Sequence, residues 1–214
     1  MTAVDDHVSN FTNYDSSMEF HFFNYTKKNL ASLVHRKKLD KSIWLIYFHS
    51  TTKTINMVLE EFENILLNFD DDFIVALNQD DKIVLWELYR IGPMSPIQSN
   101  IIADWTAAEG LKITSICKWE RRSNLLGYNF KITNLVDEYY TTKIEMDEII
   151  TGKYNLQGSL VDLLNLFANA MNFTYTYVPP PDNAWGSLQK DGSWNGMVNL
   201  VLKEVVDFCK YYLK

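Results

Sequence analysis

Long hydrophobic runs are missing from this 214-residue sequence. A helix that crosses a bilayer needs about 20 predominantly apolar residues, and the longest apolar stretches, such as residues 43–48, have only the length of a strand. The amino terminus, MTAVDDHVSNFTNYD, is acidic and polar, whereas a secretory signal has a basic start and an apolar centre. We therefore expect neither a membrane span nor a secretory signal within these residues.

Positive charge is also scarce. Lys and Arg together number 20 against 27 Asp and Glu, which gives a formal net charge of -7, and the only dense basic cluster is at residues 35–38. Proteins that bind nucleic acids neutralise phosphates with clustered Lys and Arg side chains. We therefore expect no nucleic-acid partner.

Sequence motifs of catalysis and metal binding are absent as well. There is no GxSxG nucleophile turn and no glycine-rich phosphate loop, and the four histidines lack the close spacing that places two imidazoles on one metal. The run Asp70 to Asp72 fits a solvated turn, because consecutive carboxylates point in different directions. The sequence predicts no enzyme, no metal site and no cofactor.

The chain has two cysteines and three glycosylation sequons. Cys117 and Cys209 could pair in an oxidising compartment or remain as free buried thiols, and both interpretations stay open. The sequons at Asn10, Asn24 and Asn172 are candidate glycosylation sites, although a chain of this composition contains about two or three by chance.

The first half of the chain has the pattern of a small α/β unit. Residues 43–48 are a candidate buried strand, and two further strands are expected at 73–77 and 83–88, separated by turn-forming polar residues. Between the first and second strands, apolar residues recur at helical spacing, at Ile55, Val58, Phe62, Ile65 and Leu66. The pattern predicts the order β-α-β-β.

The most informative segment is 152–198. An apolar stretch at helical spacing begins at Gly158, and the aromatic residues of 173–177 then alternate with Thr as in a strand. Prolines 179–181 end the strand, and Trp185 and Gly186 follow near its carboxyl end. Ligands bind outside the carboxyl ends of strands in open α/β sheets, so we expect a ligand-binding lobe here.

This order of segments resembles the first half of the ligand-binding domain of ionotropic glutamate receptors, and most of all their divergent insect-type chemosensory relatives. The stretches 86–90, 105–111 and 119–127 similarly resemble the short amino-terminal region of those receptors. The motif residues that carry the resemblance are Gly158, Asp162, Asn172 to Tyr175, Trp185, Gly186, Trp194, Asn195, Gly196 and Met197.

The resemblance implies two regions in an α/β chain. Residues 1–120 would be an amino-terminal α/β region, and residues 121–214 would be part of lobe 1 of a periplasmic-binding-protein-like clamshell, with 128–136 as its first strand. Gly158, Asp162, Gly186 and the motif Trp194 to Met197 are expected to have structural roles. Trp185 would face the ligand, or would instead pack its loop onto its own lobe; both roles remain open.

The function implied is that of the extracellular ligand-binding portion of a ligand-gated cation channel subunit in the plasma membrane. Its ligand would be a small molecule of the amino acid or organic acid class, and its partners would be co-receptor subunits in a tetramer. Ligand binding would favour closure of the clamshell and pull on the pore.

The sequence also departs from the family pattern. A segment bearing a Thr and an Arg that clamp the ligand's carboxylate is missing between Lys203 and Glu204, and no arginine follows Arg122. Bidentate capture of a carboxylate therefore has no assigned residue, and we do not expect glutamate binding.

We interpret the chain as a fragment, a truncated isoform or an incomplete gene model. The alternatives are a soluble clamshell-type binding or regulatory protein, an intracellular interaction module and, third, an enzyme.

Overall fold

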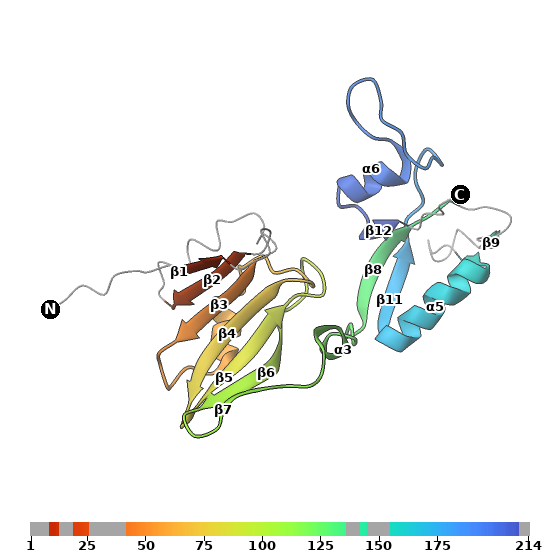
Figure 1. Cartoon of the computed structure of the whole chain (residues 1–214). Coiled ribbons are helices and arrows are strands. Elements are labelled where there is room, and N and C mark those ends of the chain that lie inside the picture. The colour runs from red at the N-terminus through yellow and green to blue at the C-terminus, as the bar shows by residue number, and fades with distance from the viewer. Residues whose placement is uncertain (1–8, 13–18, 26–41, 136–141, 145–154, 210–214) are drawn as a thin grey trace. The chain divides into compact units, whose positions relative to one another are not determined.

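The computed structural model describes residues 9–12, 19–25, 42–135, 142–144 and 155–209. These residues fall into two compact units, Met1–Arg121 and Arg122–Lys214 (Figure 1). Both units combine strands with helices, and the α/β class predicted from the sequence is confirmed.

The first unit is built on a seven-stranded sheet whose strands follow chain order. Strands β2, β3 and β4 run parallel, and the remaining neighbours pair antiparallel. The strands are β1 (Ser9–Thr12), β2 (Glu19–Asn24), β3 (Ile43–Phe48), β4 (Asp72–Gln79), β5 (Lys82–Tyr89), β6 (Gln98–Thr106) and β7 (Gly110–Ile113), with helices α2 (Ile55–Glu61) and α3 (Lys118–Arg121).

The structure confirms the three strands predicted at 43–48, 73–77 and 83–88, which are β3, β4 and β5. The predicted helix is shorter than its apolar spacing suggested, because α2 ends at Glu61. A turn follows in which the Ile65 amide donates to the Phe62 carbonyl at 2.8 Å. This turn buries Ile65 without a helix and leaves Leu66 54% exposed.

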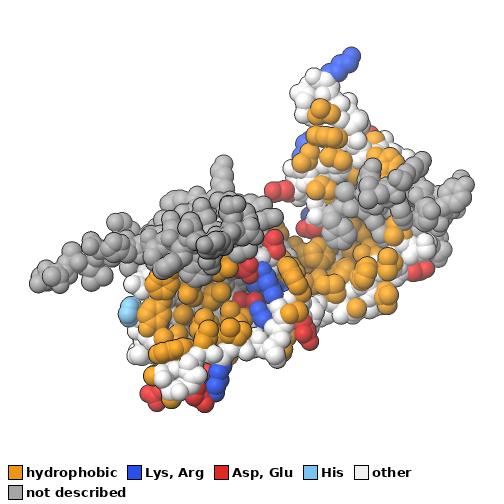
Figure 2. Space-filling model, viewed as in Figure 1, with side chains coloured by type: hydrophobic (Ala, Val, Ile, Leu, Met, Phe, Trp, Pro, Cys, Tyr) orange, Lys and Arg blue, Asp and Glu red, His pale blue; other side chains and the backbone are white. Residues whose placement is uncertain are grey.

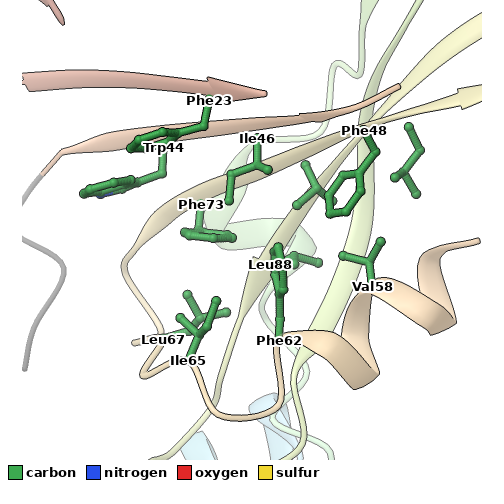
Figure 3. Close-up of a cluster of buried hydrophobic side chains, with 12 residues drawn as sticks. Phe23, Trp44, Ile46, Phe48, Val58, Phe62, Ile65, Leu67, Phe73 and Leu88 are labelled. Atoms are coloured by element: carbon green, nitrogen blue, oxygen red, sulfur yellow. The ribbon is translucent and has the colours of Figure 1, made fainter. Parts of the chain in front are cut away.

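The core of the first unit lies on one face of the sheet, which we call the core face. Phe23, Trp44, Ile46 and Phe48 project from β2 and β3 onto α2 and the segment that follows it, where Val58 is fully buried (Figure 3). Aromatic rings stack along this layer, with 5.6 Å between the ring centroids of Phe23 and Trp44. The packing explains why the alternating pattern of β3 was readable in the sequence.

The short helix α3 is held against the sheet by two ion pairs. The Lys118 ammonium lies 2.7 Å from a carboxylate oxygen of Asp72, and the Arg121 guanidinium donates at 2.9 and 2.8 Å to the two carboxylate oxygens of Glu87. Glu87 also accepts a hydrogen bond from Asn100 on β6 at 3.0 Å. These bonds hold the end of the first unit, Arg121, against its sheet.

The second unit contains a three-stranded parallel sheet in the order β11-β8-β12. Its elements are β8 (Tyr128–Thr133), β9 (Thr142–Ile144), β10 (Asn155–Gln157), α5 (Ser159–Met171), β11 (Phe173–Tyr177), α6 (Gly196–Leu202) and β12 (Phe208–Cys209). The helix and strand predicted after Gly158 are confirmed as α5 and β11. The first strand, expected at 128–136, is β8, which ends at Thr133.

Candidate ligand-binding site

Strand order reverses around β8. The chain passes from β8 through α5 to β11 on one side, and then through α6 to β12 on the other side. Because parallel crossovers are right-handed, connections that step in opposite directions run over opposite faces, and Figure 1 shows α5 and α6 on different sides of these strands. A reversal of this kind opens a crevice at the carboxyl ends of the strands, where doubly wound folds bind ligands.

The carboxyl end of β8 is well anchored. The Tyr177 hydroxyl donates to the Asn134 carbonyl at 2.8 Å, and the Val178 amide donates to the Ile132 carbonyl at 2.8 Å. These bonds tie β11 to β8 beyond their last paired residues. The edge is therefore ordered where a ligand would meet the sheet.

Two polar side chains at this edge bury atoms that make no hydrogen bond among the described residues. They are the Thr133 hydroxyl, which is fully buried, and the Oδ1 atom of Asn134, whose residue is 6% exposed. Leaving a buried polar atom without a hydrogen bond costs about 1 to 3 kcal/mol. An apolar side chain at the same position would avoid this cost, so the two polar side chains are candidates for contact with a ligand. Neither residue was predicted from the sequence. Two polar residues at the end of an alternating strand could have indicated them.

The loop after β11 is bound tightly to the start of α6. The Asp182 carboxylate accepts from the Gly196 amide at 3.0 Å, and the Met197 amide donates to the Ala184 carbonyl at 3.0 Å. The Val198 amide completes the contact by donating to the Trp185 carbonyl at 3.3 Å. The backbone of Trp185 is thereby fixed, while its side chain remains 41% exposed.

Two glycines permit this close approach. Gly196 has φ +63°, and a Cβ atom there would lie 2.3 Å from the Ala184 carbonyl oxygen; at Gly186, with φ +132°, it would lie 2.6 Å from a methyl carbon of Val198. Only glycine tolerates both the positive φ and the contact. The structure thus brings Trp185, Gly186 and the Asn195 to Met197 turn together.

The hairpin 187–195 carries the rest of the motif. Leu188 pairs with Trp194 in an isolated bridge, and the Asn195 side chain accepts from the Ser187 amide at 2.7 Å. Hydrogen bonds from Ser193 hold the pKa of the exposed Asp191 carboxyl below its usual value. Asn195 has ordinary extended angles, φ -105° and ψ -174°, whereas Gly196, which follows it, has φ +63°.

Gly158 and Asp162 lie at the start of α5, away from this turn in the sequence. Gly158 is the residue before the helix, with φ 125°, and its carbonyl accepts from the Asp162 amide at 3.0 Å. A carboxylate in the first turn favours the helix dipole. Gly158 and Asp162 therefore lie where α5 begins.

The chain passes from α6 into β12 through a short segment, residues 203–207. α6 ends at Leu202, Glu204 adopts φ +55°, and Asp207 exchanges bonds with Lys131 of β8 through its amide at 2.8 Å and its carboxylate at 2.6 Å. Burial and the charge of Asp207 raise the pKa of the Tyr128 hydroxyl. The chain therefore closes β12 onto β8 directly.

The predicted glycosylation sequons and Cys117 lie elsewhere in the chain. Asn24 ends β2 and is exposed, Asn10 lies in β1, and the exposed Asn172 closes α5 in a left-handed conformation while donating to the Asn124 side chain at 2.9 Å. Glycosylation at the three sequons stays a prediction. Cys117 is exposed with a free thiol.

Two general features of the described ranges bear on the class of protein. No group of three or more His, Cys, Asp or Glu side chains in them is placed to hold a metal ion. In the same ranges, no helix combines the length and the apolar character that a bilayer crossing requires.

Comparison with known proteins matches both halves of the chain to receptor families. Residues 128–212 match the family described as ligated ion channel L-glutamate- and glycine-binding site, and residues 20–134 match the family ionotropic receptor 75a N-terminal. The chain belongs to the ionotropic glutamate receptor superfamily. The resemblance stated from the sequence is confirmed at that level.

Individual relatives match about half of the chain. Delta-2 ionotropic glutamate receptor of Danio rerio is 31% identical over 104 residues, which is 48% of this chain and 10% of the relative. Human kainate 1 ionotropic glutamate receptor is 30% identical over 110 residues, 50% of this chain and 11% of the relative. The chain thus spans about a tenth of the length of these relatives.

Among solved structures, the chain is similar to ligand-binding domains of ionotropic glutamate receptors. A Mnemiopsis leidyi domain in complex with D-serine has 23% identity and a TM-score of 0.33, and covers 39% of this chain and 33% of that one. A Pleurobrachia bachei domain in complex with glycine has 20% identity and the same TM-score, with 39% and 32% coverage.

Proposed function

We propose that the chain is part of a ligand-gated cation channel subunit of the chemosensory ionotropic receptor type. In this proposal residues 1–120 are its amino-terminal region and residues 121–214 are the beginning of its extracellular ligand-binding domain. The two compact units of the structure support a boundary near residue 120, and the family matches over 20–134 and 128–212 support the order of the two regions. The full subunit would lie in the plasma membrane and assemble with co-receptor subunits in a tetramer, and this chain would be a fragment of it.

The observation that carries the proposal is the carboxyl edge of the β11-β8-β12 sheet in the second unit. The strand reversal around β8 places Thr133 and Asn134 at the carboxyl edge, and the loop that follows β11 holds a rigidly mounted, 41% exposed Trp185. Ligand sites combine aromatic side chains with a few polar groups, and here both kinds of residue lie at or after the carboxyl ends of the neighbouring strands β8 and β11. We therefore propose that Trp185 covers the ligand.

The proposed ligand class rests on the family match and on the arginine content of the second unit. The family model that matches residues 128–212 is described as an L-glutamate- and glycine-binding site, which supports a ligand of the amino acid or organic acid class. No arginine follows Arg122, so this chain lacks the planar donor that captures a carboxylate with two parallel bonds. We therefore do not propose glutamate as the ligand.

The proposal is tested by recording currents from the subunit encoded by the full transcript that carries this chain, expressed with a co-receptor subunit. We expect currents evoked by small amino or organic acids, and a higher half-maximal concentration in Trp185→Ala with the maximal current retained. Trp119→Ala is the control, since Trp119 is similarly exposed, at 58%, but lies in the first unit. Equal effects of both changes would count against the role of Trp185.

A further inference from the structure

The three glycosylation sequons differ in where the fold places them. Asn10 lies inside β1, where it pairs with His21, and Asn24 is the last residue of β2, where it pairs with Tyr47. Asn172 instead lies in the turn between α5 and β11 and is exposed. All three sequons have Thr at their third position, so the motif alone does not rank them. Glycosylated sequons belong to surface loops, and the fold therefore favours Asn172.

The Asn172 side chain keeps an amide hydrogen that a sugar could replace. Its amide nitrogen donates one hydrogen to the Asn124 side chain at 2.9 Å, and it makes no second bond to the described residues. The backbone of Asn172 has φ 52° and ψ 63°, a left-handed conformation that asparagine adopts at helix ends. Glycosylation replaces one of the two amide hydrogens, so both the bond to Asn124 and this conformation can persist in the modified chain.

We propose that Asn172 carries an N-linked glycan. In this reaction the amide nitrogen of Asn172 bonds to the anomeric carbon of an oligosaccharide that is attached to a lipid diphosphate. The bond between that carbon and the diphosphate oxygen breaks, the diphosphate leaves with the bonding electrons, and the nitrogen gives up one proton. The inference rests on the extracellular location proposed above, because N-linked glycans are found on secreted and extracellular chains.

The attachment point lies at the opposite edge of the sheet from the candidate ligand site. Asn172 directly precedes Phe173, the first residue of β11, whereas the candidate site lies beyond Tyr177, the last residue of that strand. Five strand residues at about 3.3 Å each separate the two edges by about 16 Å. A glycan at Asn172 is therefore compatible with a ligand at the carboxyl edge.

The surface beside Asn172 suits a bulky, hydrophilic group. Two of its polar neighbours in the chain and in space, Asn124 and Thr174, are exposed. The helix that ends beside it, α5, also exposes apolar side chains, with Leu166 62% and Phe167 50% exposed. Figure 2 shows hydrophobic side chains over the region that α5 occupies in Figure 1. Exposed apolar surface favours aggregation, and a solubilising glycan at the end of the helix would oppose it.

The test is the occupancy of each sequon in the full subunit, expressed in animal cells with a co-receptor subunit. Mass spectrometry after enzymatic deglycosylation, which converts a glycosylated Asn to Asp, measures the occupancy. Asn172→Gln removes the acceptor, Thr174→Ala removes the sequon, and Thr174→Ser retains it. Thr176→Ala is the matched control, because Thr174 and Thr176 are both exposed on β11 and both bond to the Asn129 side chain at 2.9 Å, but Thr176 lies outside the sequon.

We expect a glycan at Asn172 in the unchanged subunit, in Thr174→Ser and in Thr176→Ala, and its loss in Asn172→Gln and Thr174→Ala. An unmodified Asn172 in subunits that carry a glycan at Asn10 or Asn24 would overturn the inference and leave the extracellular location intact. The absence of a glycan from all three sequons would overturn the inference and would also count against the extracellular location.

Discussion

Single glycines set the geometry of the loop that carries Trp185. Gly196 and Gly192 both have positive φ, at +63° and +84°, but a Cβ atom meets the Ala184 carbonyl oxygen at 2.3 Å only at Gly196, and nothing within 4 Å at Gly192. The two residues therefore separate the effect of backbone conformation from the effect of close approach.

Gly196→Ala should destabilise the second unit more than Gly192→Ala does. The left-handed conformation alone costs a non-glycine residue about 1 to 2 kcal/mol, and Gly192→Ala should cost no more than that. At Gly196 the backbone must also move away from Ala184, so the loss should be larger. Urea unfolding of both variants measures the difference, and equal losses would show that the close approach is unimportant.

Tyr25 predicts a pH dependence of the first unit. Burial, followed by hydrogen bonding to Glu61 and its negative charge, raises the pKa of the Tyr25 hydroxyl from 10.0 to about 12. Since the folded state favours the neutral hydroxyl, this contribution to stability is complete below pH 10 and is lost as the pH rises to about 12.

The check is the unfolding free energy of the unchanged chain and of Tyr25→Phe across that pH window. The difference between them should shrink from pH 10 upward, because the variant has no hydroxyl to ionise. A constant difference across the window would contradict the assigned cause. Other tyrosines and lysines titrate in both proteins and cancel in the comparison.

Among the elements, α3 has only four residues. We expect the ion pairs of Lys118 and Arg121 to hold it in place. The Glu87 side chain is 4% exposed and that of Arg121 is 15% exposed. Removing one partner of a fully buried pair costs about 3 to 5 kcal/mol, and the partial exposure of Arg121 lowers our expectation for Glu87→Gln to about 2 to 3 kcal/mol.

The matched control for this pair is Glu109→Gln, which breaks the exposed pair of Glu109 and Lys112. Surface pairs contribute little to stability, so this variant should unfold nearly as the unchanged chain does. Thermal unfolding of the two variants and of the unchanged chain reports the result. If both variants behave alike, α3 is held by packing rather than by the Arg121 to Glu87 pair.

Elements with clear periodicity were predictable from the sequence, and those set by long-range pairing were not. α5 and β11 followed from the apolar spacing after Gly158 and the aromatic alternation that succeeds it. β6 was missed, because a bulge at Ile102 interrupts its alternation opposite Leu85 and Trp86. α2 was predicted too long, because a turn satisfies the apolar positions after Phe62.

The candidate site was predictable only in part for a similar reason. Trp185 and Gly186 stood out as a large aromatic beside a glycine after a strand. Thr133 and Asn134 gain their place from β12, a strand of two residues that pairs with β8 from far along the chain. Nothing local in residues 208–209 predicts that pairing.

The whole molecule combines two compact units, and we propose that the second unit contacts a ligand. Superfamily membership rests on matches that together extend over residues 20–212. The ligand-binding role rests on the second unit, whose match covers residues 128–212.

The most direct test of the central claim is the dose–response of the full subunit, expressed with a co-receptor subunit, before and after Trp185→Ala. The account predicts a ligand-evoked current whose half-maximal concentration rises in Trp185→Ala and stays unchanged in Trp119→Ala, with equal surface expression of all three proteins. A current from the full subunit that is insensitive to Trp185→Ala, or no response to any small amino or organic acid, would contradict it.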